Sequence, residues 1–318
     1  MRTEPTTDAT GIQPGAAASH RPGAGGWVVA GLSAGLVVMW SSGFVGGRLG
    51  TQDASTLSLL SWRFLVLAPL VAAVLLVLAR TRSLTVRAWP RHALLGVLSQ
   101  VVYLGGVIGA IELGVGAGTS ALVAALQPLL TGALTGPLLG QRTSARRWTG
   151  LGIGFAGVAV VVGGDLSTGS APPWAYLLPF AGMLGLTAAT LMEAASPSRA
   201  PIVEGLGVQC LASAVVFTAA AGATGTLTGP FLAEGTFWLA VAWVIVLSTF
   251  GGYGFYWLTL RHTDATRVGT LMYLSAPTTA IWAWLMFGDP IRWTALLGFA
   301  VCLIGVAAVF LSRGRAWR

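Results

Sequence analysis

One arginine lies inside an otherwise apolar stretch of the sequence. In LSLLSWRFLVLAPLVAAVLL, residues 57–76, Arg63 is the seventh residue. If this stretch is a helix, the rise of 1.5 Å per residue puts Arg63 about 9 Å from its start. At this depth a guanidinium either snorkels to the polar surface or faces inward, where it binds a negatively charged group. We expect an inward partner to be Glu112, in an ion pair that is a structural clamp, a gate or a reader of charge.

Polar and aromatic side chains recur near the middle of other apolar stretches. Each of them alone is typical of packing between helices, but together they predict an aromatic, weakly polar pocket for a small molecule. Gln127 directly precedes Pro128, and Tyr273 lies shortly before Pro277. A proline inside a helix frees a backbone carbonyl, which a ligand or a neighbouring helix can bond. The candidate binding residues are Trp40, Arg63, Gln100, Tyr103, Gln127, Thr249, Tyr253 and Tyr273.

Residues for common catalytic chemistry do not cluster along the chain. A serine protease needs a histidine near its serine, metal-dependent transfer needs grouped acids, and an ATP-binding P-loop needs a lysine. The chain has no lysine, and its two cysteines lie within separate apolar runs. The histidines and aspartates are scattered as His20, His92, His262, Asp8, Asp53, Asp165, Asp264 and Asp289. We therefore expect no enzyme activity, no metal and no cofactor.

The composition indicates an integral membrane protein. Of the 318 residues, 55% are hydrophobic and 9% are charged, and the mean hydropathy is +0.77. An ordinary soluble domain has about 25% charged residues. All 18 basic residues are arginines, and with 10 acidic residues they give a formal net charge of +8. Because the arginines fall mostly between apolar runs, they form no patch for nucleic acid, and the expected environment is the lipid bilayer.

Ten apolar stretches are long enough to cross a bilayer, which takes about 20 helical residues. They are 27–47, 57–79, 93–112, 117–138, 148–164, 174–193, 205–224, 238–260, 267–287 and 292–311. They predict an all-α membrane protein of ten transmembrane helices with no soluble domain. Residues 1–26 are expected to form a disordered cytoplasmic tail, and residues 313–318 a basic one. A cleaved signal peptide is the alternative for the N-terminus, but the first apolar run is too long for it.

The arginines also predict the orientation of the spans, because positively charged loops stay in the cytoplasm. With a cytoplasmic N-terminus, 15 of the 18 arginines lie on the cytoplasmic side, and only Arg48, Arg63 and Arg292 do not. Both termini are therefore expected in the cytoplasm. The predicted location is the plasma membrane, as a multi-pass protein.

An internal repeat divides the chain into two halves. A Pro-Gly-Gly-Gly series with spacings of 12, 10 and 7 residues in the first half recurs with spacings of 11, 10 and 7 in the second. Its members are Pro128, Gly140, Gly150 and Gly157, and Pro277, Gly288, Gly298 and Gly305. The halves, 27–164 and 174–312, then hold five spans each, and an odd number places them in opposite orientations. Convergence of a Gly- and Ala-rich membrane sequence is the alternative explanation.

Three kinds of motif follow one another over about residues 27–312. They are WSSGFV in the first stretch, SWRF in the second, and the Pro–apolar–Gly–spacer–Gly–Gly ending of each half. By this pattern the chain resembles the EamA-type family of the drug/metabolite transporter superfamily. Where that family carries Gly-Glu after the fourth helix of each half, this chain has Gly140-Gln141 and Gly288-Asp289. The first half thus lacks the acid.

The resemblance implies a secondary transporter that exports small metabolites or drugs by alternating access between inverted repeats. Its substrate would be an amino-acid-like metabolite or a drug. Without a P-loop, the energy would come from a gradient, from exchange or from downhill flow. A passive channel or a membrane scaffold subunit is the alternative. GxxxG pairs such as Gly43/Gly47 and Gly150/Gly154 are explained by packing within one bundle, and a homodimer is a second use for them.

Overall fold

The chain is helical throughout its described part. A computed structural model describes residues 26–81, 84–140, 144–169, 171–196, 200–263 and 265–310. Residues 1–25, the tail 313–318 and Gln141 lie outside the described residues. The α-helices are α1 (Gly26–Gly50), α2 (Thr56–Thr81), α3 (Trp89–Gly96), α4 (Tyr103–Glu112), α5 (Ala117–Ala125), α6 (Gln127–Leu139), α7 (Ala145–Thr168), α8 (Leu177–Ala195), α9 (Ile202–Ala223), α10 (Gly235–Trp243), α11 (Tyr253–His262), α12 (Ala265–Met272), α13 (Ser275–Phe287) and α14 (Trp293–Phe310).

Eight helical segments of the described chain are long and apolar enough to cross a membrane, and they overlap the first eight predicted ranges. Two of them contain a π-helical stretch. The segment Val86–Glu112 contains α3, a π-helical stretch η2 (Val97–Val102) and α4, and Gly235–His262 contains α10, the π-helical η5 (Val244–Gly252) and α11. Helices suit these sequences because a helix satisfies its backbone polar groups internally, as lipid requires.

The last two predicted ranges are helical but fall short of that length. The range 267–287 is divided into α12 and α13 by a turn at Tyr273 and Leu274. The range 292–311 corresponds to α14, in which the apolar helix extends over Trp293–Ala307. The structure thus supports eight spans by length and composition.

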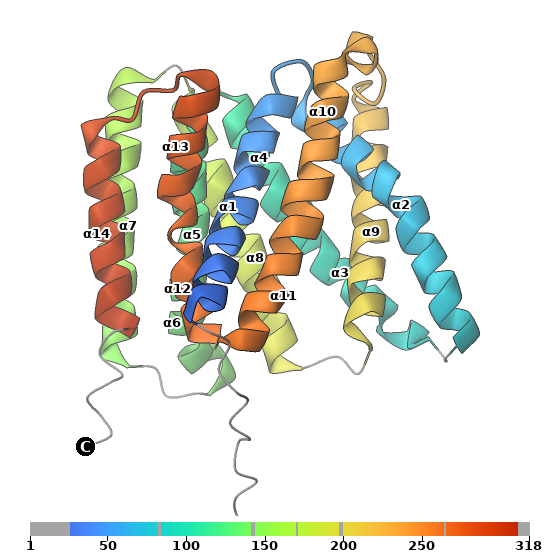
Figure 1. Cartoon of the computed structure of the whole chain (residues 1–318), viewed down its shortest axis with the longest axis horizontal. Helices are drawn as coiled ribbons and strands as arrows, with labels where there is room; N and C mark the ends of the chain where they lie inside the picture. The colour runs from blue at the N-terminus through green and yellow to red at the C-terminus, as the bar shows by residue number, and fades with distance from the viewer. Residues whose placement is uncertain are drawn as a thin grey trace, which may run out of the picture.

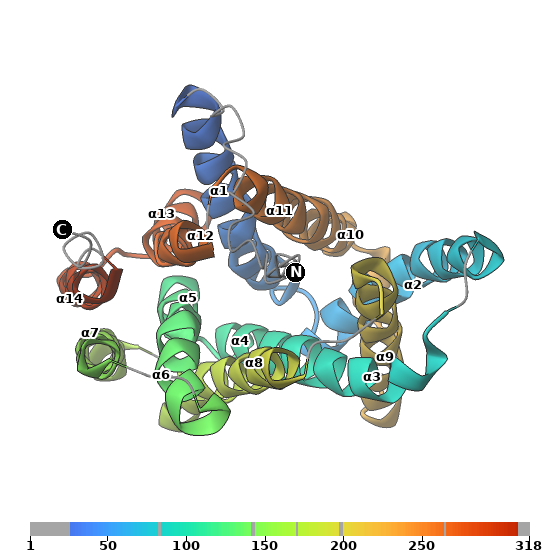
Figure 2. The same ribbon diagram turned by 90° about the horizontal axis from the view of Figure 1, so that it is seen from below.

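The helices pack in a pattern that pairs the two halves (Figures 1 and 2). In both views α7 and α14 lie side by side at one edge of the bundle, and α2 packs against α9 and α5 against α13. The helix α1 packs against α10, η5 and α11, whereas α8 packs against η2 and α4. Taken span by span, exchanging the halves maps these contacts onto each other, because α1 and α8 are the first spans of their halves, and α5–α6 and α12–α13 are the fourth. The packing thus has the two-fold character that the repeat predicts.

The repeated glycines meet each other in the contact between α7 and α14. A Cβ atom at Gly157 would lie 2.8 Å from the backbone oxygen of Gly298, and one at Gly305 would lie 2.8 Å from that of Gly150. Side chains at these positions would push the helices apart, so glycine permits the close approach. This explains why the same glycine spacing occurs in both halves.

Two further features repeat at matched positions. The fourth span of each half is broken, once between α5 and α6 at Leu126 (φ −70°, ψ −15°) and once between α12 and α13 at Leu274 (φ −71°, ψ −13°). The helix after each break ends at a left-handed glycine, Gly140 (φ 67°) or Gly288 (φ 70°), where glycine avoids the strain of a Cβ atom. The π-helical segments η2 and η5 lie in the third span of their respective halves.

Ion pairs join the halves at what we call the upper end of the bundle, the top of Figure 1, where α1 ends and α2 begins. There Arg48 pairs with Asp289 at 3.2 Å, and Arg292 pairs with Asp165 at 3.6 Å. At the opposite, lower end, Arg91 pairs with Glu193 at 3.2 Å. Each of these pairs has one member in each half.

Candidate functional site

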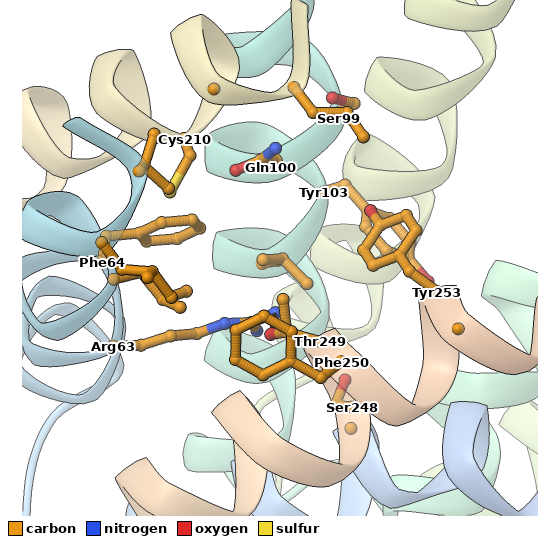
Figure 3. Close-up of a pocket in the computed structure, with 18 of the residues that line it drawn as sticks. Arg63, Phe64, Ser99, Gln100, Tyr103, Cys210, Ser248, Thr249, Phe250 and Tyr253 are labelled. Carbon is orange, nitrogen blue, oxygen red and sulfur yellow. Dashed lines mark hydrogen bonds between the residues drawn. The ribbon is translucent and has the colours of Figure 1, made fainter. Parts of the chain in front are cut away.

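A cavity of about 600 Å³ lies between the two halves (Figure 3). This volume is in the range of small-molecule pockets, which are about 300–1,000 Å³. Its walls come from α1, α2, η2, α4, α8, α9, η5 and α11, and most of its lining is aliphatic or aromatic. The polar or aromatic residues with hydrogen-bonding groups that line it are Trp40, Arg63, Ser99, Gln100, Tyr103, Cys210, Ser248, Thr249, Tyr253 and Trp257.

Arg63 is the charged residue of this cavity. It is 6% exposed, and the helical rise puts it about 10 Å from the first residue of α2. Its Nη2 donates a hydrogen bond of 2.9 Å to Oγ1 of Thr249, toward which the side chain extends in Figure 3. Its Nε has no acceptor within the described chain, and its Cζ lies 5.4 Å from the centre of the Phe64 ring. A buried cation with one neutral hydrogen-bond partner is energetically costly.

The prediction that Arg63 forms an ion pair with Glu112 is wrong. Oε2 of Glu112 instead accepts a hydrogen bond of 2.8 Å from the backbone N–H of Thr56, the first residue of α2. Helix N-termini have N–H groups without partners and a partial positive charge. Glu112 therefore caps α2 at the upper end, two helical turns away from Arg63.

The π-helical segment η5 positions the partner of Arg63. Thr249 donates its own hydroxyl hydrogen to the backbone oxygen of Val244 at 2.9 Å, five residues earlier, which leaves its oxygen free to accept from Arg63. Ser248 and Phe250 on the same segment also line the cavity. π-Helical segments are often found at functional sites because they displace side chains from their α-helical positions.

The matched segment η2 supplies the opposite wall. Ser99 and Gln100 lie on it, and Tyr103 begins α4 directly after it. Oε1 of Gln100 is buried without a hydrogen-bond donor in the described chain. Such a group can accept a hydrogen bond from a bound molecule.

A second cavity of about 680 Å³ continues from the first toward the lower end. Trp40 and Tyr253 line both cavities, and their ring centres are 6.1 Å apart in an edge-to-face contact. Gln127 lines the second cavity, where its Nε2 donates to Thr131 at 3.0 Å and to Thr190 at 3.1 Å. An aromatic pair thus stands where the two cavities meet.

Arginines are the charged residues that line these two cavities. Arg63 lines the first and Arg147 the second, and the described lining of both contains no aspartate or glutamate. Nη1 of Arg147 donates to the backbone oxygen of Gly132 at 3.0 Å. The combined space therefore carries positive charge, which favours anions and disfavours cations.

The structure brings six of the eight predicted binding residues to the first cavity and one, Gln127, to the second. Tyr273 is the exception, because it lies in the turn between α12 and α13, is 3% exposed and packs in the main hydrophobic core. It lines neither of these cavities. The break in the span turns its side chain into the core, which the prediction from a continuous helix did not include.

Among the cavity residues that were not predicted, Ser99 and Ser248 have a signal in the sequence. Leu98-Ser99-Gln100 in the first half matches Leu247-Ser248-Thr249 in the second. Each serine precedes the repeat proline, Pro128 or Pro277, by 29 residues. Extending the repeat comparison to the third span would have identified this pair.

Comparison with known proteins agrees with the helical packing and the repeat. A sequence model of the EamA-like transporter family matches residues 27–163 and 173–311, which is most of the chain. The chain belongs to the EamA-like transporter family. As an EamA-like protein it is a multi-pass membrane transporter of the drug/metabolite superfamily, and the two matched segments are its two EamA repeats.

Solved structures share the fold of this EamA-like chain. One of them, titled "Crystal structure of protein", has a TM-score of 0.64 at 20% sequence identity. The match covers 92% of this chain and 99% of that one. A search of curated proteins found no match.

Proposed function

We propose that this EamA-like protein is a secondary transporter that exports small metabolites or drugs across the plasma membrane by alternating access. The observation that carries the proposal is the cavity between the halves, whose opposite walls are the matched segments η2 and η5. A site at the interface of two repeats is lined by both of them. Rocking one repeat against the other can therefore expose the site to each side of the membrane in turn.

The proposed topology has ten spans and cytoplasmic termini. The ninth span consists of α12 and α13, which resemble the broken pair α5 and α6 of the first half, and the tenth is α14. Broken helices are tolerated in a membrane where the freed backbone groups are buried in protein or face a cavity. The upper end is then extracellular, and residues 27–164 and 174–312 are the two functional halves.

In this proposal, ion pairs between the halves close the cavity at one end in each of the two alternating states. Arg48–Asp289 and Arg292–Asp165 close the upper end, whereas Arg91–Glu193 lies at the lower end. Rocking would break one set and keep the other. Asp289 is the acid that follows Gly288 in the second half, so this acid has a role in closing the outer face.

Counterflow in proteoliposomes tests the proposal. Purified protein is screened for binding of amino acids, their precursors and drugs, and each ligand found is preloaded on one side of the membrane. We expect the preload to accelerate uptake of labelled ligand from the other side, and we expect Gln100→Trp, which fills the cavity, to abolish the acceleration. Gly152→Ala is the matched control because nothing lies within 4 Å of its Cβ position.

Each result of this experiment decides between the proposal and its alternatives. Saturable uptake with counterflow supports a carrier. Uptake without counterflow would replace the carrier with a channel, and a ligand that binds but does not cross would favour a scaffold subunit.

GxxxG glycines face the bundle interior at Gly43, Gly47, Gly118 and Gly154, so the transport unit in this proposal is one chain, and a homodimer would add no residue to the cavity.

A further inference from the structure

We infer that the substrate of the proposed transporter carries one carboxylate on an apolar, aromatic-sized body, and that Arg63 binds the carboxylate. The inference rests on the proposed function and adds a substrate class to it. Its starting observation is that Arg63, a residue only 6% exposed, is the charged residue among the described residues that line this cavity.

The charge of Arg63 is not neutralised by the protein. Its hydrogen bond within the described chain goes to the neutral hydroxyl of Thr249, and its Nε has no acceptor. The described residues that line the cavity include no acid, and Glu112 is engaged at the N-terminus of α2. A guanidinium has five N–H donors in a planar arrangement that fits a carboxylate. An anionic ligand would therefore provide the missing counter-charge.

The fold itself does not require a cation at this place. The helix that corresponds to α2 in the second half is α9, which packs against α2 and contains no lysine or arginine. A second helix without a cation is thus sufficient for this architecture, since the charged residue of α9 is an acid, Glu204, in its first turn. Buried charges are expensive inside a membrane protein and are usually associated with function, so the presence of Arg63 in one half alone points to its ligand.

The geometry places the bound anion at the interface of the halves. Arg63 belongs to α2 in the first half, and Thr249, which fixes its Nη2, belongs to η5 in the second. Around them lie the rings of Phe64, Tyr103 and Tyr253. A carboxylate on Arg63 leaves the rest of a small ligand against these rings, and the single cation suits a monoanion better than a dianion.

A series of ligands with one body and different head groups tests the inference on the wild-type protein. The probes are 3-phenylpropanoate, 3-phenylpropanamide and 3-phenylpropylamine, and binding is measured by calorimetric titration in detergent. We expect the acid to bind at least about tenfold more tightly than the amide, because hydrogen bonds to charged groups are strong, and the amine to bind more weakly still. An amide or amine that binds as tightly as the acid would overturn the inference, as would a stronger binding of 3-phenylpropyl phosphate.

Variants assign the effect to Arg63. We expect Arg63→Gln to reduce the affinity for the acid to that of the amide, Arg63→Lys to restore part of the difference, and the exposed arginine variant Arg146→Gln to leave it unchanged. Thermal unfolding of each variant shows that it is folded. A folded Arg63→Gln protein that still prefers the acid would contradict the inference.

Counterflow separates the failure of this inference from the failure of the proposed function. If Arg63→Gln shows counterflow of the amide at the same rate as the wild-type protein, the protein is still a carrier. The role of Arg63 is then limited to the preference for a charged head group. If the acid and the amide bind equally to the wild-type protein and both show counterflow, the inference fails and the proposed function stands. If no ligand that binds shows counterflow, the proposed function fails.

Discussion

At position 63 a cation lies in the protein interior with a threonine hydroxyl as its hydrogen-bond partner. Removing one partner of such a contact has a different effect from removing the other. Arg63→Gln removes the buried charge, so we expect the ligand-free protein to become more stable, by about 1–3 kcal/mol. Thr249→Val leaves the charge without a partner, and we expect it to lose a similar amount.

Thermal unfolding in detergent, followed by tryptophan fluorescence, measures both effects. The double variant Arg63→Gln/Thr249→Val should be about as stable as Arg63→Gln alone, because without the charge the hydroxyl has little to contribute. A lower melting temperature for Arg63→Gln than for the wild type would show that Arg63 is a structural clamp.

Glu112 gives a second prediction at the residue scale. Its carboxylate caps α2 through the backbone N–H of Thr56, so we expect Glu112→Ala to cost about 1 kcal/mol of stability. Glu112→Gln keeps a hydrogen-bond acceptor and should cost less. Binding of any transported ligand should survive in both variants. Loss of binding in Glu112→Gln with an unchanged melting temperature would return Glu112 to the role of a gate.

The residues of the site were predictable to different degrees. Arg63, Gln100 and Thr249 could be selected from the sequence because polar groups in membrane helices rarely face lipid. The contact between Arg63 and Thr249 could not be predicted, because it depends on the packing of α2 beside η5 and on a π-helical offset. Glu112 was assigned to Arg63 by proximity along the membrane normal, whereas the N-terminus of α2 is the closer positive group.

At the scale of elements, the contact between α7 and α14 allows a direct test of the repeated glycines. A Cβ atom at Gly157 would lie 2.6 Å from Sγ of Cys302 and 2.8 Å from the backbone oxygen of Gly298. We expect Gly157→Leu to destabilise the protein by at least about 2 kcal/mol, because the backbone oxygen cannot move without separating the helices. Gly152 lies on the same helix with nothing within 4 Å of its Cβ position.

The matched variant Gly152→Ala should be neutral or slightly stabilising, since alanine favours the helix by up to about 1 kcal/mol. Both are measured by thermal unfolding. Equal melting temperatures for Gly157→Leu and Gly152→Ala would show that α7 and α14 do not pack closely in the membrane.

Helix positions were easier to predict than helix irregularities. The thickness of the hydrocarbon core fixes the length of an apolar span, so the predicted ranges overlap the observed helices throughout. The π-helical segments depend on tertiary packing, and no local pattern in the sequence indicates them. The turn at Tyr273 also depends on how the span packs, although Pro277, four residues later, marks a place where the helix can break. The misassignment of Tyr273 follows directly from this, because a turn in the middle of a span changes the direction of every side chain near it.

At the scale of the whole molecule, the ion pairs of the upper end should control access to the cavity. Cys210 lines the cavity and is a natural reporter, whereas Cys302 is 2% exposed between α7 and α14. We expect the double variant Arg48→Gln/Arg292→Gln to favour the outward-open state. An anionic, membrane-impermeant methanethiosulfonate should then modify Cys210 from the outer face at least about tenfold faster than in the wild type, as a shift of about 1.4 kcal/mol between the states would produce.

The control is Cys210→Ser in the same background, which should abolish the labelling. Equal labelling rates with and without the upper ion pairs would contradict their role in closing the outer face.

The presence of Arg63 in α2, with no basic residue in the corresponding α9, also affects how such a carrier works in each direction. If the halves were identical, exchanging them would turn the inward-facing state into an equivalent outward-facing one, and half-saturation would occur at the same substrate concentration on both sides. With the cation in one half, the two states hold the anion differently. The half-saturation concentrations should therefore differ between the two faces, and without an applied gradient the maximal rates in the two directions must differ by the same ratio.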